Sequence, residues 1–413
     1  MNPAPEFDIT VDSLTYGGDA MGRLPDGRAV FVPFALPGER VRVRLVEEKR
    51  GYARARLVEV LHPARERIAP RCPCYMSCGG CNYEHMPYSM QLSVKKEILR
   101  EQLQRIGGLQ EPPVEDSLPS PKEWNYRNHI QLHLTPEGKL GFEAAHSHHV
   151  VPLEVCYLPE EGINEAWPLL EVDPVPGLER INFREGAGGE ILMVLEGSEN
   201  SLPEFSIQDI PISAVHLSPA GSILLAGRDY LVMEVLGRSF SVSAGSFFQV
   251  NTLQAEAMVR FLLERVPVTP NTTLLELYSG VGLFSAFLAP RVQRLVAIES
   301  SPDPCRDFEI NLDEFDNVEL YEAPVADVLP GLDLQQPGII LADPPRSGLG
   351  RLVVEQIIRL NPDTIVYISC DPATLARDAR DFIRGSYRLQ SITPVDMFPQ
   401  TYHIESISLW TRA

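Results

Sequence analysis

Residues 367–378 read Tyr367-Ile-Ser-Cys-Asp-Pro-Ala-Thr-Leu-Ala-Arg-Asp378. The pattern predicts a buried strand over residues 364–368, an N-cap at Asp371 and the first helical residue at Pro372. The thiol of Cys370 is therefore expected at a strand's carboxyl end, where open α/β sheets bind ligands. The start of the following helix would lower the pKa of this thiol. A cysteine at a strand end is more often a small buried hydrophobe, so the surrounding sequence must decide.

Around this stretch, from about Ala244 onward, strand patterns alternate with helix patterns. Such alternation is typical of a doubly wound, Rossmann-like α/β domain with a parallel sheet, here assigned to residues 244–413. The expected helices, besides the one after Pro372, span residues 252–266, 283–289, 302–315 and 349–360. The other expected strands span residues 273–278, 294–299, 318–321, 338–342, 387–395 and 405–411.

A glycine turn follows the first strand of this domain. Gly280 and Gly282 permit a tight turn, but Ser285 replaces the third glycine of the dinucleotide fingerprint, and each glycine alone could be an ordinary turn. Glu299, at the end of the second strand, suits a pair of ribose hydroxyls. The fourth strand ends in Asp343-Pro-Pro-Arg346, where many methyltransferases of this fold keep Asp/Asn-Pro-Pro. Together these features fit a nucleoside cofactor without a pyrophosphate, such as S-adenosylmethionine.

Charge is distributed unevenly in this acidic chain of 413 residues, whose formal net charge is -20. Residues 40–71 contain ten Lys/Arg and four Asp/Glu, a basic island that is compatible with an RNA footprint, or else with a solvated face of a strand pair. Residues 154–209 are acidic and are expected to face away from RNA. No apolar run is long enough to span a bilayer, so we expect a soluble, cytoplasmic protein without a membrane partner, monomeric in the absence of any sign of an obligate partner.

The first 62 residues have alternating strand patterns separated by Gly-Gly and Asp-Gly turns. Short strands with such turns predict a small β-barrel with one basic face. Residues 63–243 are expected to form a β-rich central domain that contains one amphipathic helix over residues 86–106.

The central domain begins with a cysteine loop. Cys72, Cys78 and Cys81 form C-x5-C-x2-C, Cys74 is an extra thiol inside the loop, and Cys156 lies far downstream. Zinc sites usually take two closely paired cysteine knuckles, whereas an iron-sulfur cubane takes three cysteines from one loop and a fourth from elsewhere. One close pair and two adjacent glycines favour a [4Fe-4S] cluster over zinc. The spacing differs from the C-x3-C-x2-C of radical enzymes, which makes a radical mechanism the weaker interpretation.

Several motifs, taken in order, resemble those of the RNA 5-methyluridine methyltransferases. They are Ser246-Phe-Phe-Gln-Val-Asn251, Leu277-Tyr-Ser-Gly-Val-Gly282, Asp343-Pro-Pro-Arg-Ser-Gly348, Ser369-Cys-Asp-Pro-Ala-Thr-Leu-Ala-Arg-Asp378 and Phe398-Pro-Gln-Thr-Tyr-His-Ile-Glu405. The first domain resembles the TRAM domain, an RNA-binding barrel, through residues 14–22 and 35–41. The barrel and the cysteine loop together resemble the 23S ribosomal-RNA branch of the family. The resemblance implies methyl transfer from S-adenosylmethionine to C5 of a uridine in RNA.

The expected chemistry accounts for two residues independently. C5 of uracil is a poor nucleophile, so the Cys370 thiolate must add to C6, and a base, Glu405, must later remove the C5 proton. His403, two residues earlier, either positions Glu405 or is a plain structural histidine. The family assigns the same roles to the cysteine and the glutamate that align here. Two rival functions remain, a transfer-RNA uracil-5-methyltransferase and a non-catalytic RNA-binding paralogue.

The resemblance also implies a set of cofactor contacts. They are Gln249, Tyr278, Gly280, Glu299, Asp327 and Asp343. Two positions depart from the family pattern. Leu283 stands where some members have a polar cofactor contact, and Asp371 stands where Asn is usual. A carboxylate at Asp371 would tend to raise the pKa of the Cys370 thiol, against the effect of the helix start.

Overall fold

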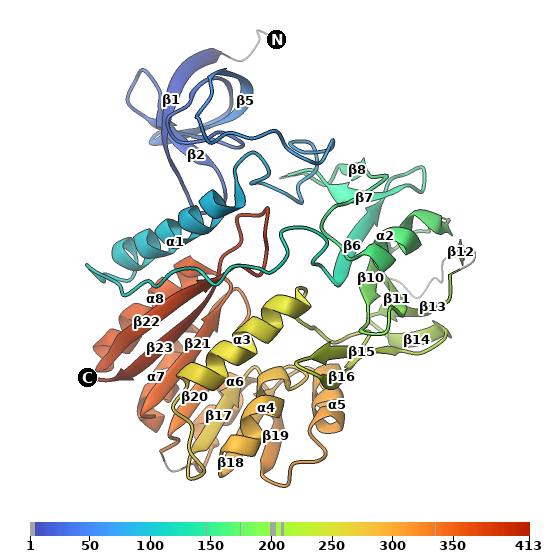
Figure 1. Cartoon of the computed structure of the whole chain (residues 1–413), viewed down its shortest axis with the longest axis vertical. Coiled ribbons are helices and arrows are strands. Elements are labelled where there is room, and N and C mark those ends of the chain that lie inside the picture. The colour runs from blue at the N-terminus through green and yellow to red at the C-terminus, as the bar shows by residue number, and fades with distance from the viewer. Residues whose placement is uncertain (1–4, 146, 174, 199–203, 208–209, 335) are drawn as a thin grey trace.

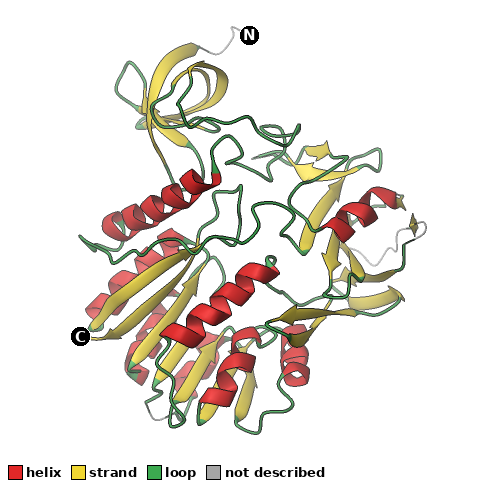
Figure 2. Cartoon of the chain, viewed as in Figure 1, coloured by secondary structure: helices red, strands yellow, loops and turns green. Residues whose placement is uncertain are grey.

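The computed structural model describes residues 5–413 except 146, 174, 199–203, 208–209 and 335. A barrel, a β-rich middle part and a helix-covered α/β sheet follow one another along the chain (Figures 1 and 2). Within the described residues, no helix has the length and apolar character needed to cross a membrane.

The N-terminal barrel is closed by five strands in the order β1-β2-β3-β5-β4, as the turn pattern predicts. The strands are β1 (Glu6–Leu14), β2 (Ala20–Arg23), β3 (Ala29–Val32), β4 (Arg40–Glu48) and β5 (Tyr52–His62). In β4 Val41 and Val43 point into the barrel and the arginines outward, because successive side chains of a strand face opposite sides. The basic residues of the island are therefore on the outer surface.

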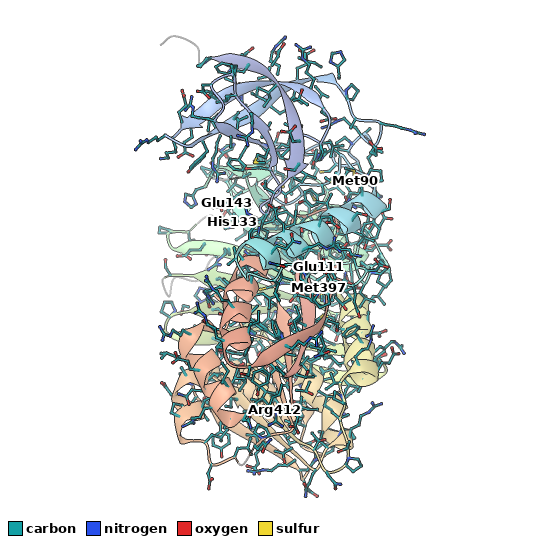
Figure 3. The ribbon with its side chains drawn as sticks, turned by 90° about the vertical axis from the view of Figure 1, so that its left-hand side faces the viewer. Met90, Glu111, His133, Glu143, Met397 and Arg412 are labelled. Atoms are coloured by element: carbon teal, nitrogen blue, oxygen red, sulfur yellow. The ribbon has the colours of Figure 1, made fainter. Side chains whose placement is uncertain are left out.

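Helix α1 (Tyr88–Arg105) lies between the barrel and the α/β sheet (Figures 1 and 3). Ile98, Leu99 and Leu103 on this helix pack into the apolar core of the α/β sheet. On the same helix, the buried ammonium of Lys95 contacts Asp396 at 2.6 Å. Met90 and Val94 of the same helix pack against the core of the barrel, so α1 contacts both the barrel and the C-terminal part of the chain.

The middle part is built on a seven-stranded sheet of order β14-β13-β11-β10-β6-β7-β8. Its strands are β6 (His129–Leu134), β7 (Leu140–Glu143), β8 (Val150–Pro152), β10 (Leu178–Glu185), β11 (Ile191–Gly197), β13 (Ile212–Ser218) and β14 (Gly221–Ala226). Helix α2 (Glu161–Ala166), the pair β9 (Leu170–Val172) and β12 (Phe205–Ile207), and the hairpin β15 (Tyr230–Val235) and β16 (Arg238–Ser243) complete this part.

The C-terminal sheet has seven strands in the order β19-β18-β17-β20-β21-β23-β22. They are β17 (Thr273–Leu277), β18 (Arg294–Glu299), β19 (Val318–Glu322), β20 (Ile339–Ala342), β21 (Thr364–Ser369), β22 (Tyr387–Val395) and β23 (Glu405–Arg412). The first five in this order run parallel, and β20 and β21 are buried throughout, as strands covered on both faces must be.

The last two strands differ from the expected parallel sheet. β22 and β23 pair antiparallel, and β23 lies between β21 and β22. The cause is the short connection over residues 396–404, which has no crossover helix of the kind that parallel neighbours require.

Helices cover both faces of this sheet (Figure 2). One apolar core lies between the sheet and α1, α7 and α8, and a second lies between the sheet, α3, α4 and α5. The bounds are α3 (Thr252–Arg265), α4 (Leu283–Leu288), α5 (Pro302–Asn311), α6 (Val325–Val328), α7 (Gly350–Leu360) and α8 (Pro372–Arg384). The short helix α6 was not expected from the sequence.

Candidate active site

The predicted site residues gather at one edge of the C-terminal sheet, where its parallel strands end. Tyr278 follows β17, Glu299 ends β18, and Asp327 comes shortly after β19 on α6. Asp343 follows β20 and Cys370 follows β21. Because the carboxyl ends of parallel strands meet at the same edge, the sheet brings these five residues to one side. We call this side the carboxyl edge.

The glycine turn is held by Glu299. The backbone N–H of Gly280 donates to Glu299 Oε2 at 3.0 Å, while Oε1 accepts from the N–H groups of Ser300 and Ser301. Tyr278 itself has a left-handed backbone, with φ of 63°. The carboxylate expected to receive ribose hydroxyls is therefore already oriented by three backbone donors.

Gly282 is required for packing. A Cβ at this position would lie 2.3 Å from a methyl carbon of Leu312 and 2.9 Å from the ring of Phe308, both associated with α5. Its φ of 87° also favours glycine. Leu283, which departs from the family pattern, is buried in the core behind the turn and offers no polar side chain to a cofactor.

The remaining two predicted cofactor contacts are less tightly held. The carbonyl of Gln249 accepts a hydrogen bond from Asn128 Nδ2 at 2.9 Å, which ties the segment before α3 to the middle part of the chain. Asp327 is exposed to solvent on α6. Both are available for a ligand, and neither is buried in the core.

The start of α8 has the expected geometry. Asp371 is the N-cap, with Oδ1 accepting from the N–H groups of Ala373 and Thr374 at 3.0 and 2.8 Å, and Pro372 is the first helical residue. Cys370 is thus the last residue before the helix cap. The carboxylate of Asp371 is directed at the start of the helix. The pKa of the Cys370 thiol is determined mainly by burial and by Glu405, Asp343 and Arg346.

The expectation of a lowered thiol pKa is wrong for the protein without its substrates. Burial, together with the carboxylates of Glu405 and Asp343, raises the pKa of Cys370 to about 12, although Arg346 acts in the opposite direction. Desolvation of the thiolate outweighs the attraction of the helix start. The thiol is therefore protonated at neutral pH in this state.

Glu405 lies across from Cys370 on the neighbouring strand. Ser369, the last residue of β21, pairs with Ser406 of β23. Because the two strands are antiparallel, Cys370, which follows Ser369, lies opposite Glu405, which precedes Ser406. Burial raises the pKa of Glu405 well above its usual range, and Asp343 raises it further. Burial also raises the pKa of Asp343, to about 7.

Arg346 also belongs to this site, although the motif over residues 343–348 that contains it did not indicate a role for it. Its positive charge lowers the pKa of both Cys370 and Glu405, and it is the cation that affects both groups. The guanidinium lies 3.2 Å from Nδ1 of His403. Burial lowers the pKa of His403 to about 3, so this imidazole is neutral and contacts Arg346.

The segment before Glu405 is held by residues from distant parts of the chain. Gln400 has a left-handed φ of 69°, and its carbonyl accepts from the N–H groups of Asn82 and Tyr83, at 2.9 and 3.0 Å. Its side chain and N–H pair with the buried amide of Gln91 on α1. Neither Gln91 nor Asn82 was expected to contribute to this site, because each is far from Gln400 in the sequence and no local pattern indicates the contact.

The four predicted cluster ligands, three from the cysteine loop and one from downstream, line one small cavity. Cys72, Cys78, Cys81 and Cys156 all line it, whereas Cys74 packs against the apolar core of the middle part. The N–H of Gly80 donates to Cys78 Sγ at 3.3 Å. Across the described residues, no group of three or more His, Cys, Asp or Glu side chains has the arrangement of a metal site.

The glycine of the cysteine loop has a steric role. A Cβ on Gly79 would lie 2.8 Å from the carbonyl oxygen of Glu143 and 3.0 Å from the nitrogen of Ala145. Burial raises the pKa of Cys78 to about 12 and that of Cys156 to about 11. Burial therefore opposes ionisation of these thiols in the protein alone.

The basic island of the barrel is partly neutralised by ion pairs. Arg42 forms two hydrogen bonds with Asp8, the closer at 2.9 Å, and Arg44 pairs with Glu6. These pairs are solvent-exposed, and such pairs contribute little to stability. Arg56 is exposed and makes no ion pair within the part of the chain that the structure describes.

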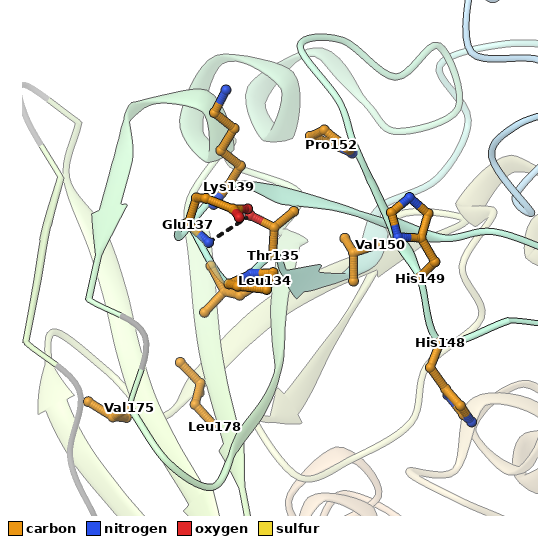
Figure 4. A pocket seen from close by; sticks show the side chains of 11 residues that line it. Leu134, Thr135, Glu137, Lys139, His148, His149, Val150, Pro152, Val175 and Leu178 are labelled. Atoms are coloured by element: carbon orange, nitrogen blue, oxygen red, sulfur yellow. Dashed lines mark hydrogen bonds between the residues drawn. The ribbon is translucent and has the colours of Figure 1, made fainter.

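A cavity of about 860 Å³ lies elsewhere, at the end of the middle sheet (Figure 4). Thr135, Lys139, His148 and Leu178 are among its lining residues, and Thr135 Oγ1 accepts from the N–H of Glu137 at 3.3 Å. None of the predicted site residues lines this cavity. Its size therefore says nothing about the chemistry at the carboxyl edge.

The chain is similar in sequence to known protein families. The family described as tRNA (Uracil-5-)-methyltransferase matches residues 199–413, and the TRAM domain matches residues 5–58. Two proteins named as uncharacterized RNA methyltransferases, from Aquifex aeolicus and Streptomyces avermitilis, are 35% and 32% identical. The alignments cover 97% of both chains in the first case and 98% of both in the second.

A solved structure has the same fold. It is the Pyrococcus abyssi tRNA (uracil-54, C5)-methyltransferase in complex with S-adenosyl-L-homocysteine, with a TM-score of 0.75 and 24% identity. The match covers 98% of this chain and 99% of that one.

Proposed function

Because this chain belongs to the tRNA (uracil-5-)-methyltransferase family, we propose that it methylates C5 of an RNA uridine through a covalent bond between Cys370 and C6. The chain is an RNA methyltransferase that acts on uracil C5 with S-adenosylmethionine as donor. The observation that carries the covalent mechanism is the placement of Cys370 and Glu405 at the ends of neighbouring strands. A thiol and a carboxylate beside one another are the two groups that the reaction needs.

The reaction proceeds in four steps at the uracil ring. The Cys370 thiolate adds to C6, and the electron pair moves through C5 to the O4 carbonyl as an enolate. C5 then attacks the methyl carbon of the sulfonium donor; the S–CH3 bond breaks and its electron pair stays on sulfur, so that the donor leaves as a thioether. Glu405 takes the remaining proton from C5. The electron pair of that C–H bond re-forms the C5–C6 double bond and expels Cys370 as a thiolate.

The protein's charges decide when each group ionises. Arg346 stabilises the thiolate of Cys370 and the carboxylate of Glu405, whereas the two carboxyl groups Glu405 and Asp343 oppose each other's ionisation. A protonated Glu405 cannot act as a base, so its proton must leave before the C5 proton is removed. Arg346 thus acts on both partners of the reaction, and its neutral neighbour His403 holds the guanidinium in place.

The residues at the carboxyl edge would hold the methyl donor. Glu299, oriented by the glycine turn, would receive the ribose hydroxyls. The other proposed contacts are Gln249, Tyr278, Gly280, Asp327 and Asp343. A target uracil in folded RNA must be unstacked to reach this edge, because the thiol and the base approach it from the protein.

The four cysteines of the shared cavity would hold a [4Fe-4S] cluster. Support comes from the donor set, four thiols facing one cavity with a backbone N–H directed at one sulfur. The cluster would connect the cysteine loop to the strand region around Cys156. Because Asn82 and Tyr83 follow the loop and bind Gln400, an ordered loop also supports the segment before Glu405.

We propose ribosomal RNA as the substrate and a transfer RNA as the second candidate. The first rests on the combination of a TRAM-like barrel with a cysteine loop, which resembles the ribosomal-RNA branch. The second is favoured by the description of the matching family and by the solved relative, a transfer-RNA enzyme. In both cases residues 1–62, 63–243 and 244–413 would act as the barrel, the central domain and the methyltransferase domain.

Mass-spectrometric mapping of 5-methyluridine tests this function. Ribosomal and transfer RNA should be compared from cells with the gene, without it, and with the Cys370→Ala gene. Loss of one 5-methyluridine from ribosomal RNA in the last two strains would support the first candidate, and loss from transfer RNA the second. An unchanged map in both RNAs would contradict methylation of C5 in either substrate.

A further inference from the structure

A tyrosine of the barrel contacts the cap of the catalytic helix. Tyr16 lies in the turn between β1 and β2, and its hydroxyl donates a 2.6 Å hydrogen bond to Asp371 Oδ2. Asp371 directly follows Cys370 and caps α8. More than three hundred residues of sequence separate the two partners, so only the fold brings them together.

At this contact, the barrel and the α/β domain each pack a tyrosine against the core of the other. Tyr16 packs against the apolar core of the C-terminal sheet, and Tyr402, from the segment before Glu405, packs against the core of the barrel. Their ring centroids are 6.4 Å apart and nearly perpendicular. A Cβ on Gly18 would lie 3.2 Å from Tyr402 Cβ, so the turn sits close to this segment. One barrel turn therefore contacts both chain segments that present the reacting residues.

The hydrogen bonds of Asp371 divide its carboxylate between two partners. Oδ1 accepts from the N–H groups of Ala373 and Thr374, and Oδ2 accepts from Tyr16. Burial and the nearby Asp371 raise the pKa of Tyr16 above its usual range, so the phenol keeps its proton and remains a donor. Both oxygens of the Asp371 carboxylate, which lies beside Cys370, thus accept hydrogen bonds, one from the start of α8 and the other from the barrel.

We propose that Tyr16 is a positioning residue that acts through Asp371 to hold the start of α8, and with it the Cys370 thiol, ready for reaction. The inference rests on the proposed role of Cys370 as nucleophile. It also explains Asp at a position where Asn is usual in the resembling family. A carboxylate oxygen accepts from a phenol that keeps its proton, whereas the amide nitrogen of Asn cannot accept. Docking of the barrel would then be linked directly to the reactivity of the thiol.

The test uses Tyr16→Phe, which removes only the hydroxyl, in the full-length protein. Tyr52→Phe is the matched control, because Tyr52 is an exposed barrel tyrosine whose ring contacts Phe31. With a 5-fluorouridine RNA as the trapping substrate, adduct formation by Tyr16→Phe should be about tenfold slower than by the unmodified protein or the control, because a hydrogen bond to a charged group is lost. The KM for RNA should stay unchanged.

The pH profile distinguishes positioning from general structural support. Loss of the phenol leaves Asp371 Oδ2 without its donor. The uncompensated charge of this carboxylate should then oppose the thiolate, as Glu405 and Asp343 already do. The rate should therefore rise at a higher pH in Tyr16→Phe than in the unmodified protein. In the Asp371→Asn background, which lacks this charge, Tyr16→Phe should change the rate less than about twofold.

Three results would overturn the inference. They are an unchanged rate in Tyr16→Phe, a loss confined to the KM for RNA, and an equal loss in the Asp371→Asn background. If Tyr16→Phe fails to fold, the Asp371→Asn variant tests the inference by itself. The pH dependence of its adduct-forming rate should then move to lower pH. Failure of the unmodified protein to form any adduct would instead contradict the covalent mechanism, and the two failures can be told apart.

Discussion

Cys370 and Glu405 leave two hydrogen-bonded antiparallel strands at the same level of the C-terminal sheet. The relationship depends on β23 lying directly beside β21, since a strand inserted between them would separate the thiol from the carboxylate. The carboxylate of Glu405 raises the pKa of the Cys370 thiol and so opposes its ionisation, whereas Arg346 lowers the pKa of both groups.

Cys370→Ala should abolish methyl transfer and leave binding of S-adenosylmethionine nearly unchanged, because the thiol forms the bond to C6 but is not among the proposed cofactor contacts. Transfer of a labelled methyl group to RNA and calorimetric titration with the cofactor measure the two effects. Cys305→Ala, which alters a buried thiol on α5, serves as control and should retain activity. Appreciable turnover by Cys370→Ala would exclude the covalent mechanism.

Glu405→Gln should still transfer the methyl group but release product slowly, because the C5 proton has no base. A methylated RNA joined to the protein through C6 should then survive denaturing electrophoresis when RNA and S-adenosylmethionine are both present. The adduct should disappear in the double variant with Cys370→Ala. Turnover at the unmodified rate with no trapped species would assign the base to another group.

Protein purified without oxygen should be brown and contain roughly four irons and four sulfides per chain, as a cubane requires. Serine at any one of the four cysteines of the shared cavity should remove the colour. Cys74→Ser should keep it, because this thiol packs against the apolar core and does not line the cavity. Metal analysis and the visible spectrum measure the outcome, and one zinc per chain in place of iron would contradict the cluster.

Glu276, a buried carboxyl in β17 bonded by Ser285, should make the fold less stable as the pH rises. Burial raises its pKa from 4.5 to about 8, so the folded protein keeps a proton that the unfolded chain releases. The free energy of unfolding should therefore fall between about pH 4.5 and pH 8, by an amount on the order of 4 kcal/mol. Urea unfolding of Glu276→Gln should show a shallower fall, whereas the exposed Glu264→Gln should follow the unmodified curve. Identical slopes in all three proteins would refute the assignment.

Lys95→Met should lower the free energy of unfolding by about 3 to 5 kcal/mol, because it leaves the carboxylate of Asp396 buried without its cation. Lys95→Met combined with Asp396→Leu should recover most of that loss. The neighbouring Lys96→Met provides the control, since its partner Asp116 is fully exposed and the pair is worth less than about 1 kcal/mol. Equal effects of Lys95→Met and Lys96→Met would show that the buried pair has no special weight.

Local sequence signals were sufficient for the barrel, for the parallel strands and for the start of α8. Asp371 and Pro372 are recognisable as a cap and a first helical residue because the signal lies within three residues. The same locality explains why Cys370, Glu299 and Asp343 could be placed at strand ends. Local hydrophobic periodicity indicates where a strand ends, and therefore which residues follow it, without information from distant parts of the chain.

Other features depend on contacts that no local pattern contains. The raised pKa of Cys370 comes from burial and from Glu405 and Asp343, which meet only in the folded sheet. The antiparallel placement of β23 follows from a connection without a helix, a feature that strand propensity does not report. The roles of Arg346 and Tyr16 likewise arise from residues that are distant in sequence.

The position of β23 has a consequence for biosynthesis. In chain order it is the last strand of its sheet, yet in space it separates β21 from β22. A ribosome that has made everything up to β22 has therefore made a sheet with an open apolar edge at β21 and a strand with no partner. Premature termination after β22 would yield a chain that cannot complete its sheet, exposes strand edges to aggregation and proteolysis, and lacks Glu405.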